Sequence, residues 1–234
     1  MKKLFTILLV GFALMNATSV KAQNIQLFYD VGRGCATSTV EMFRPDSYGS
    51  TFFFIDMNYS PTVSGGYWEI SRELCFWKDT PMSWLSAHIE YNGGLSVYDG
   101  MYNNSWLAGA TYSGHSADYS RTWSLSAMYK VIPGTIGLNG TKQPHSFQIT
   151  GVWGIKFANG WCSFDGFADF WREPLLYLNT NYTFITEPQF WLHLNKIEKM
   201  EKFNLSVGAE FELSVNFCKK GFKAQPALGA KWTF

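Results

Sequence analysis

Pro-Ala-Leu-Gly-Ala-Lys-Trp-Thr-Phe, residues 226 to 234, is the stretch of sequence that decides the fold. Every second residue is apolar, with aromatic residues near the end of the segment, and the residues between them are small or polar. We call these two alternating sets the apolar and the polar parity. Leu228, Trp232 and Phe234 belong to the apolar parity, whereas Gly229 and Lys231 belong to the polar one. Because successive side chains of a strand point to opposite faces, the segment predicts a strand with one apolar face.

Two kinds of protein have such a strand at this place. A soluble β domain turns the apolar face towards its core, and an outer-membrane β-barrel turns it towards lipid. Phe234, which follows alternating apolar residues, also resembles the signal that barrel-assembly machinery reads on the last strand of such barrels. We therefore expect outer-membrane lipid and the assembly machinery as partners, with the soluble β domain as the alternative.

The first 22 residues have the organisation of a secretory signal peptide. Lys2 and Lys3 supply the positive start, residues 4–15 form an apolar run, and residues 20–22 form a small-residue cleavage site. The apolar run is shorter than the roughly 20 residues that a membrane-spanning helix needs. We expect an exported mature chain that begins at Gln23.

The composition favours a barrel over a soluble domain. Aromatic residues make up 18% of the chain and charged residues only 16%, whereas soluble domains carry about 25% charged residues. An outer face in lipid and rims of aromatic side chains would explain both departures. The formal net charge of +1 gives no electrostatic case for binding nucleic acid. Residues 23–234 have a suitable length for one domain.

The four cysteines suggest no site of their own. Cys35, Cys75, Cys162 and Cys218 could form disulfides in an exported protein. Their spacing matches no metal-binding motif, and no close Cys/His pair is present. We expect incidental thiols with at most one bridge, no metal site and no cofactor.

Almost all of residues 23–234 divides into period-2 segments separated by turn signals. The sequence predicts an all-β transmembrane antiparallel barrel of about twelve strands, an even number as in bacterial single-chain barrels. The strand lengths centre on the 9–11 residues that a tilted strand needs to cross a bilayer. The predicted strands are 24–31, 37–43, 50–59, 67–77, 84–92, 105–112, 119–132, 146–157, 161–172, 182–194, 203–215 and 226–234.

Two finer expectations follow from this division. Connections should alternate between the two ends, longer on the outside (60–66, 93–104, 133–144 and 173–181) and shorter on the inside (44–49, 78–83, 113–118 and 158–160). Arg72 falls on the apolar parity of strand 67–77, which predicts a β-bulge that turns its side chain inward.

Several motifs resemble known outer-membrane barrels. Asn104–Ala110 and Ser124–Tyr129 are similar to a consecutive strand pair of the nucleoside-specific outer-membrane channel family, and Glu69-Ile70, Gly166–Phe170 and the Phe-terminated last strand fall where that family has similar runs. Gln23–Asp30 and Ser50–Met57 resemble an uncharacterised barrel family of Bacteroides-type bacteria. The resemblance implies a monomeric twelve-stranded barrel with a narrow pore that passes nucleosides.

If the apolar parity faces lipid, the other parity lines a bore of intermediate width. Aromatic side chains there could stack on a base, worth about 1–3 kcal/mol each, and carboxylates could accept hydrogen bonds from ribose hydroxyls. The candidate solute-binding residues are Phe52, Phe54, Asp56, Glu90, Asp165, Phe167, Asp169 and Trp171. The alternative is that the carboxylates pair with Lys130, Lys156 and Arg172 in the wall while the aromatic side chains fill space.

We expect a passive outer-membrane channel for small polar solutes in a Gram-negative bacterium, and not an enzyme. A lipid-modifying hydrolase or acyl transferase is one alternative, because such barrels place Ser and His within hydrogen-bond reach near a rim. His145 with Ser124 or Ser126 is the candidate pair, since His145 and Ser146 point to opposite faces. A structural or adhesive barrel is the other alternative, although the outer loops are short for it.

Overall fold

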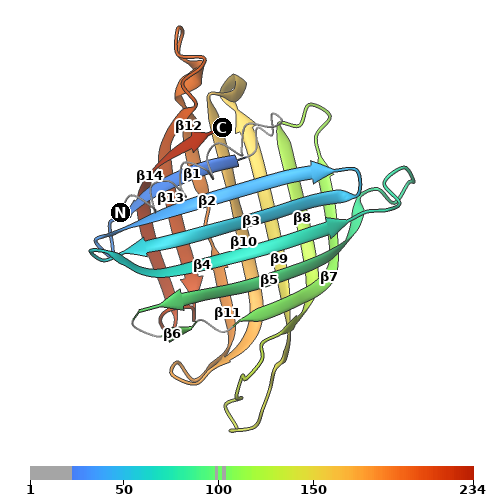
Figure 1. Ribbon diagram of the computed structural model, residues 1–234, viewed down its shortest axis with the longest axis vertical. Helices are drawn as coiled ribbons and strands as arrows, with labels where there is room; N and C mark the ends of the chain where they lie inside the picture. The colour runs from blue at the N-terminus through green and yellow to red at the C-terminus, as the bar shows by residue number, and fades with distance from the viewer. Residues whose placement is uncertain (1–22, 98–99, 102–103) are drawn as a thin grey trace, which may run out of the picture.

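The strands of the computed structural model form one antiparallel sheet that closes on itself (Figure 1). The structure describes residues 23–97, 100–101 and 104–234. The strands are β1 (Gln23–Asp30), β2 (Cys35–Asp46), β3 (Gly49–Tyr59), β4 (Val63–Leu74), β5 (Leu85–Ser96), β6 (Gly100–Met101), β7 (Ser105–His115), β8 (Arg121–Val131), β9 (His145–Phe157), β10 (Cys162–Leu175), β11 (Thr180–Thr186), β12 (Gln189–His193), β13 (Leu205–Val215) and β14 (Phe222–Thr233). The predicted signal peptide lies outside the described residues.

The barrel has twelve strand positions, as the sequence predicts. Consecutive strands pair around the wall, β1 pairs with β14 to close it, and β6 adds only two residues beside β5. β11 and β12 share one position, because each pairs with both β10 and β13. Closure leaves no long unpaired strand edge.

The predicted strand 182–194 is interrupted at Glu187-Pro188, between β11 and β12. Pro188 has no N–H to donate to a neighbouring strand, so one hydrogen bond of the ladder is missing there. The Pro188 carbonyl still accepts a hydrogen bond from Phe211 N (3.1 Å), and Glu187 N donates to Phe167 O (3.2 Å). The interruption therefore bends the wall without opening it.

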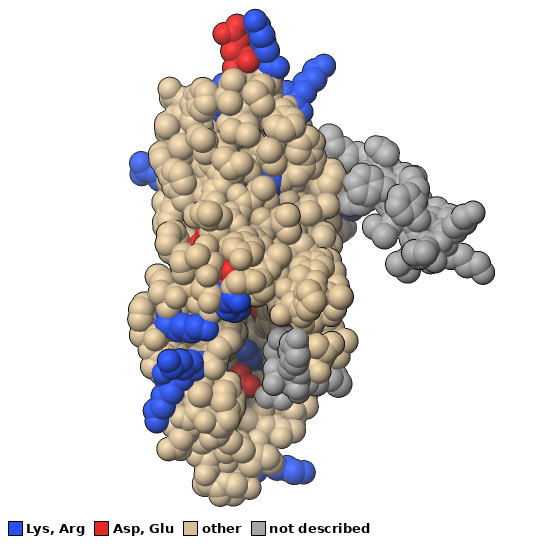
Figure 2. Space-filling view, turned by 90° about the vertical axis from the view of Figure 1, so that its left-hand side faces the viewer, with Lys and Arg blue, Asp and Glu red and all other residues tan. Residues whose placement is uncertain are grey.

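Side chains alternate between the two faces as the period-2 pattern predicts. Leu228 is 63% exposed on the outer surface, whereas Gln26 and Gln225 on neighbouring inner positions are only 2% and 3% exposed. The molecule is thus apolar outside and polar inside. Tan surface dominates the space-filling view, and Figure 2 shows both acidic and basic atoms in a hollow on this face.

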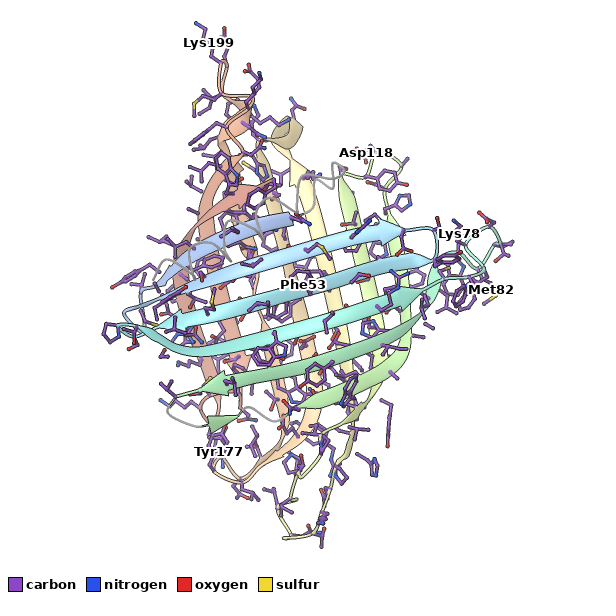
Figure 3. All side chains as sticks on the ribbon, viewed as in Figure 1. Phe53, Lys78, Met82, Asp118, Tyr177 and Lys199 are labelled. Atoms are coloured by element: carbon purple, nitrogen blue, oxygen red, sulfur yellow. The ribbon has the colours of Figure 1, made fainter. Side chains whose placement is uncertain are left out.

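The connections at the two ends do not differ in length as expected. The end near Thr233 carries the connections 47–48, 75–84, 116–120, 158–161 and 194–204. The other end carries 31–34, 60–62, 132–144, 176–179 and 216–221, together with β6 and the described residues 97 and 104 on either side of it. Figure 3 labels Lys199, Asp118 and Lys78 at the first end and Tyr177 at the other. The prediction was wrong mainly because β4 and β5 continue through the Gly65-Gly66 and Gly93-Gly94 pairs, which the sequence suggests are loop.

Arg72 lies on the outer face without a bulge. β4 stays in unbroken register there, with Arg72 opposite Thr51 on one side and Ile89 on the other. Its guanidinium donates to both carboxylate oxygens of Asp46, at 2.6 and 2.9 Å, and to Thr51 Oγ1 at 3.0 Å. The bulge prediction was wrong because a bidentate ion pair satisfies the charge where it stands.

Among the described residues, the helices are the short 3₁₀ turns η2 (Ala158–Gly160) and η3 (Leu194–Lys196), and none is long and apolar enough to cross a membrane. Cys35, Cys75 and Cys162 are thiols. Cys75 is buried with its Sγ 3.3 Å from Leu85 O.

Candidate binding surface inside the barrel

Carboxylates dominate the inner face of the barrel. The basic side chains that meet them are Lys130 on β8, Lys231 on β14 and Arg33 in the β1–β2 turn. The acidic side chains on the inner parity of their strands, or bonded to inner residues, are Asp30, Glu41, Asp56, Glu69, Glu73, Glu90, Asp165, Asp169, Glu173, Glu210 and Glu212. The near-zero net charge of the sequence therefore conceals an acidic interior.

Three aromatic rings follow one another along the inner wall of β3 and β4. The centroids of Phe52 and Phe54 lie 6.1 Å apart, and those of Phe54 and Tyr67 lie 5.9 Å apart. Tyr67 Oη donates to Glu69 Oε1 at 2.6 Å. Asp56, opposite Tyr67 in the β3–β4 register, accepts from Thr39 Oγ1 at 2.5 Å. A row of ring faces thus runs beside carboxylates, as binding of a flat polar solute would require.

Arg33 lies beside a group of acidic side chains at the end of the barrel opposite the termini. Its Nε lies 2.6 Å from Asp30 Oδ2, and its guanidinium lies 3.6 Å from Glu212 Oε2. Burial alone would lower the pKa of the Arg33 guanidinium, but the Glu212 and Asp30 carboxylates outweigh it and the pKa is raised. Arg33 also interacts electrostatically with Glu187 and Glu210. Arg33 therefore remains charged beside these acids.

His88 on β5 joins two carboxylates of the opposite part of the wall. Its Nδ1 lies 2.6 Å from Glu73 Oε1, and its Nε2 lies 3.1 Å from Glu90 Oε2. Ser86 and Thr111 also donate to Glu73, the latter at 2.8 Å. Glu73 therefore has several hydrogen-bond partners, whereas Glu90 Oε1 has none among the described residues.

The candidate residues of β10 lie along the same inner face. Asp165 accepts from Ser163 Oγ at 2.8 Å and lies 3.8 Å from Lys231 Nζ. Trp171 is buried, its Nε1 donates to Glu173 Oε2 at 2.9 Å, and Lys130 Nζ lies 4.9 Å from the centroid of its ring. Trp171 therefore has polar and cationic neighbours of its own, unlike the Phe52–Phe54 pair.

Two further aromatic rings pack together on the inner wall formed by β12, β13, β14 and β1. Trp191 on β12 is fully buried and packs against Phe28 on β1. Between them lie Gly208 and Gly229, where an added Cβ would stand 2.7 Å from Trp191 and 2.6 Å from Phe28. Lys231 Nζ lies 4.2 Å from the centroid of the Trp191 ring. The two glycines make room for the rings.

All eight predicted residues lie on the inner parity, and the structure brings only some of them together. Phe52 and Phe54 are neighbours, and Glu90 and Asp169 interact electrostatically across the bore. The alternative wall pairing is not seen, because the salt bridges of the described residues include none from Lys130, Lys156 or Arg172. Arg172 bonds instead to Gln143 Oε1 (2.7 Å). The residues that sequence reasoning missed are Phe28, Arg33, Tyr67, Glu187, Trp191 and Lys231; inner parity could have identified Tyr67 and Lys231.

The alternative catalytic pair does not assemble. Ser126 is buried on the inner face and bonds to Thr111 Oγ1 at 2.8 Å, whereas His145 is exposed and bonds to the Tyr129 hydroxyl on the outer face. A different contact, between His193 Nδ1 and Ser206 Oγ (2.8 Å), lies inside the barrel, where Ser206 is buried. Among the described residues, no group of three or more His, Cys, Asp or Glu is arranged to hold a metal ion.

This combination defines a closed twelve-position β-barrel with an apolar outer surface and an acidic, aromatic-lined interior. A family model described as a domain of unknown function, DUF5020, matches residues 22–234, and the chain belongs to that family.

Solved structures of other barrels resemble this fold. The barrel is similar to the NanC porin, with a TM-score of 0.61 and 10% identity over 91% of this chain and 100% of that one. The Acinetobacter baumannii outer membrane protein Omp33 also matches, with a TM-score of 0.43 and 12% identity over 91% of this chain and 96% of that one. The outer membrane channel DcaP of the same organism matches with a TM-score of 0.42 and 12% identity over 86% of this chain and 63% of that one. At these identities the likeness concerns the fold alone, and no curated protein matches.

Proposed function

We propose that the chain is an outer-membrane channel of a Gram-negative bacterium, through which small polar solutes, nucleosides first among them, diffuse passively. The observation that carries this proposal is the row Phe52, Phe54 and Tyr67 beside Asp56 and Glu69 on the inner wall. The rings offer faces for a base, and the carboxylates offer acceptors for ribose hydroxyls. The resemblance of several strands to nucleoside-specific channels and the porin-like fold agree with it.

The proposal includes the processing and assembly of the chain. A signal peptide over residues 1–22 would direct export, and the last strand with Phe234 would engage the barrel-assembly machinery. The outer surface of exposed apolar side chains suits lipid, and a single closed barrel needs no partner subunit to seal its edges. We therefore expect a monomer without a cofactor and without enzymatic activity.

Planar-bilayer recordings of the purified mature protein test this function. We expect stable conductance that uridine reduces and glucose does not. A Phe52→Ala/Phe54→Ala variant should weaken the reduction by uridine, because it removes two of the three rings of this row and leaves Tyr67.

A matched control replaces two outward-facing rings, Phe147→Ala/Phe170→Ala, whose centroids lie 6.0 Å apart. This control should behave like the wild type. The variant Phe167→Ala/Trp171→Ala tests the predicted residues of β10 separately. Unchanged block in it would remove those two positions from the solute path. Turnover of phospholipid without conductance would instead support the hydrolase alternative.

A further inference from the structure

One level of the bore gathers carboxylates from opposite sides of the barrel. Glu69 on β4, Glu90 on β5 and Asp169 on β10 interact electrostatically with one another. β4 and β10 are not adjacent in the sheet, so these side chains meet across the bore. A permeating solute must therefore pass close to three acidic groups.

The nearest lysine does not neutralise these acids by direct contact. Lys130 on β8 donates to the amide oxygen of Gln148 at 2.7 Å and lies over the ring of Trp171. The salt bridges of the described residues include none from Lys130 to Glu69, Glu90 or Asp169. The other basic group here is His88, which lies between Glu90 (3.1 Å) and Glu73 (2.6 Å). The carboxylates of Glu69, Glu73, Glu90 and Asp169 therefore outnumber the two basic side chains.

Three oxygen atoms at this level have no hydrogen-bond partner among the described residues. They are Glu90 Oε1, Asn92 Oδ1 and Asp169 Oδ1, on side chains that are 7%, 3% and 8% exposed. Asn92 lies opposite Glu69 in the β4–β5 register. Buried acceptors without donors are costly and rare, so each requires an explanation.

All three unsatisfied atoms are acceptors, which specifies the group that would complete them. A cation with several N–H donors satisfies such a set, whereas an anion would add further acceptors and like charge. The Tyr67 hydroxyl interacts electrostatically with Glu69, Glu90 and Asp169, so an aromatic side chain of a type that attracts cations lies near the same place. The described residues offer no metal-binding cluster.

We infer that the bore at Glu90, Asn92 and Asp169 is a selectivity site, which binds the ammonium group of small organic cations and excludes anions. The inference rests on the proposed channel function and narrows its solutes: amines and neutral hydroxyl-rich molecules pass, and phosphorylated or carboxylated ones do not.

The reversal potential of the channel in a KCl gradient tests the inference. Passages lined by charge of one sign concentrate counter-ions by roughly 10- to 1,000-fold, so we expect K⁺ permeability to exceed Cl⁻ permeability by about tenfold or more. We also expect n-butylammonium to block the K⁺ current at concentrations where butyrate has no effect. A reversal potential of the opposite sign, or equal permeabilities, would overturn the inference and leave the channel function standing. Absence of any conductance would overturn both.

The variant Glu90→Gln/Asp169→Asn locates the site, because it removes two charges and keeps the side-chain shapes. Its permeability ratio of K⁺ to Cl⁻ should fall several-fold and its block by n-butylammonium should weaken. The matched control Glu198→Gln/Asp79→Asn makes the same two changes in exposed turns at the end near the termini. Equal effects of the two double substitutions would show that selectivity arises at the rims and would refute the site. The wild-type reversal potential decides the charge preference even if the inner variant fails to fold.

Discussion

Phe28 and Trp191 pack against each other with ring centroids 5.7 Å apart, although two strands separate them in the wall. Gly208 and Gly229 occupy the intervening strands at the same level, and the rings lie over them. Because the two glycines have no side chains, the rings from the strands on either side occupy the space above them. The pair covers the inner wall at these two glycines, and we infer that it narrows the bore there.

Trp191→Ala should raise the single-channel conductance, because it removes a large ring from the interior of the bore. It should also lower stability by about 3–5 kcal/mol, as Trp truncations in packed surroundings do. Single-channel recording and the thermal midpoint in detergent check the two effects. Trp123→Ala, on the exposed outer face, is the control and should leave conductance unchanged. An unchanged conductance in Trp191→Ala would mean that another level limits the current.

Gly109→Ala should prevent stable barrel formation. The added Cβ would stand 2.1 Å from Ala127 O and 2.7 Å from Met128 Cα, both backbone atoms of the paired strand β8. Gly151→Ala on β9 is the matched control, because a Cβ there meets nothing within 4 Å. The shift in gel mobility on heating in detergent, which reports folded barrel, should be lost only in Gly109→Ala. Loss of the folded band in both variants would contradict the steric explanation.

Asp46→Asn should lower the thermal midpoint more than the double substitution Arg72→Met/Asp46→Asn. The single change leaves the Arg72 guanidinium without its bidentate partner on the apolar surface, whereas the double change removes both charges. Thermal unfolding in lipid vesicles measures the order of the two midpoints. A double variant that is less stable than the single one would show that the pair itself, and not the unpaired charge, determines stability.

The turn between β7 and β8 should respond to acid at very low pH only. Ser116 Oγ (2.6 Å), Ser120 Oγ (2.8 Å) and Ser120 N (3.1 Å) donate to Asp118 Oδ1, and these bonds lower the pKa of Asp118 from 3.8 to about 2. Because the folded pKa lies below the unfolded one, the stabilisation is present above pH 3.8 and is lost as pH falls through 2. Carboxyl NMR titration of the wild type checks the low value, and Ser116→Ala should raise it. A midpoint at the ordinary value would contradict these three hydrogen bonds to Asp118.

The strands and their faces could be predicted from the sequence because both depend on local alternation. Polar and apolar residues alternate along β8 and β13, and burial in the structure follows that alternation. The interruption at Pro188 did not follow from the proline alone, since Pro45 and Pro226 also lack the donor and yet lie within β2 and β14. Strand limits were harder at Gly65-Gly66, where glycines that suggest a turn continue the ladder.

The contacts inside the barrel could not be predicted, because they depend on the stagger between strands. Glu90 and Asp169 each lie on the expected face, but only closure of the sheet brings them to one level of the bore. Arg72 finds Asp46 across the β2–β3–β4 register, 26 residues away in sequence. The oxygen atoms without hydrogen-bond partners are likewise a property of the assembled wall, and no local sequence pattern predicts them.

The seam between β1 and β14 has a consequence for biogenesis. β1 forms its second ladder only with a strand from the far end of the sequence, running from Asn24 opposite Thr233 to Asp30 opposite Ala227. Because the chain is made from its N-terminus, one edge of β1 stays unpaired until β14 has been made. The first strand to be synthesised is therefore among the last to complete its pairing. We expect that edge to be open to wrong pairing during this time, and pairing with β14 removes it.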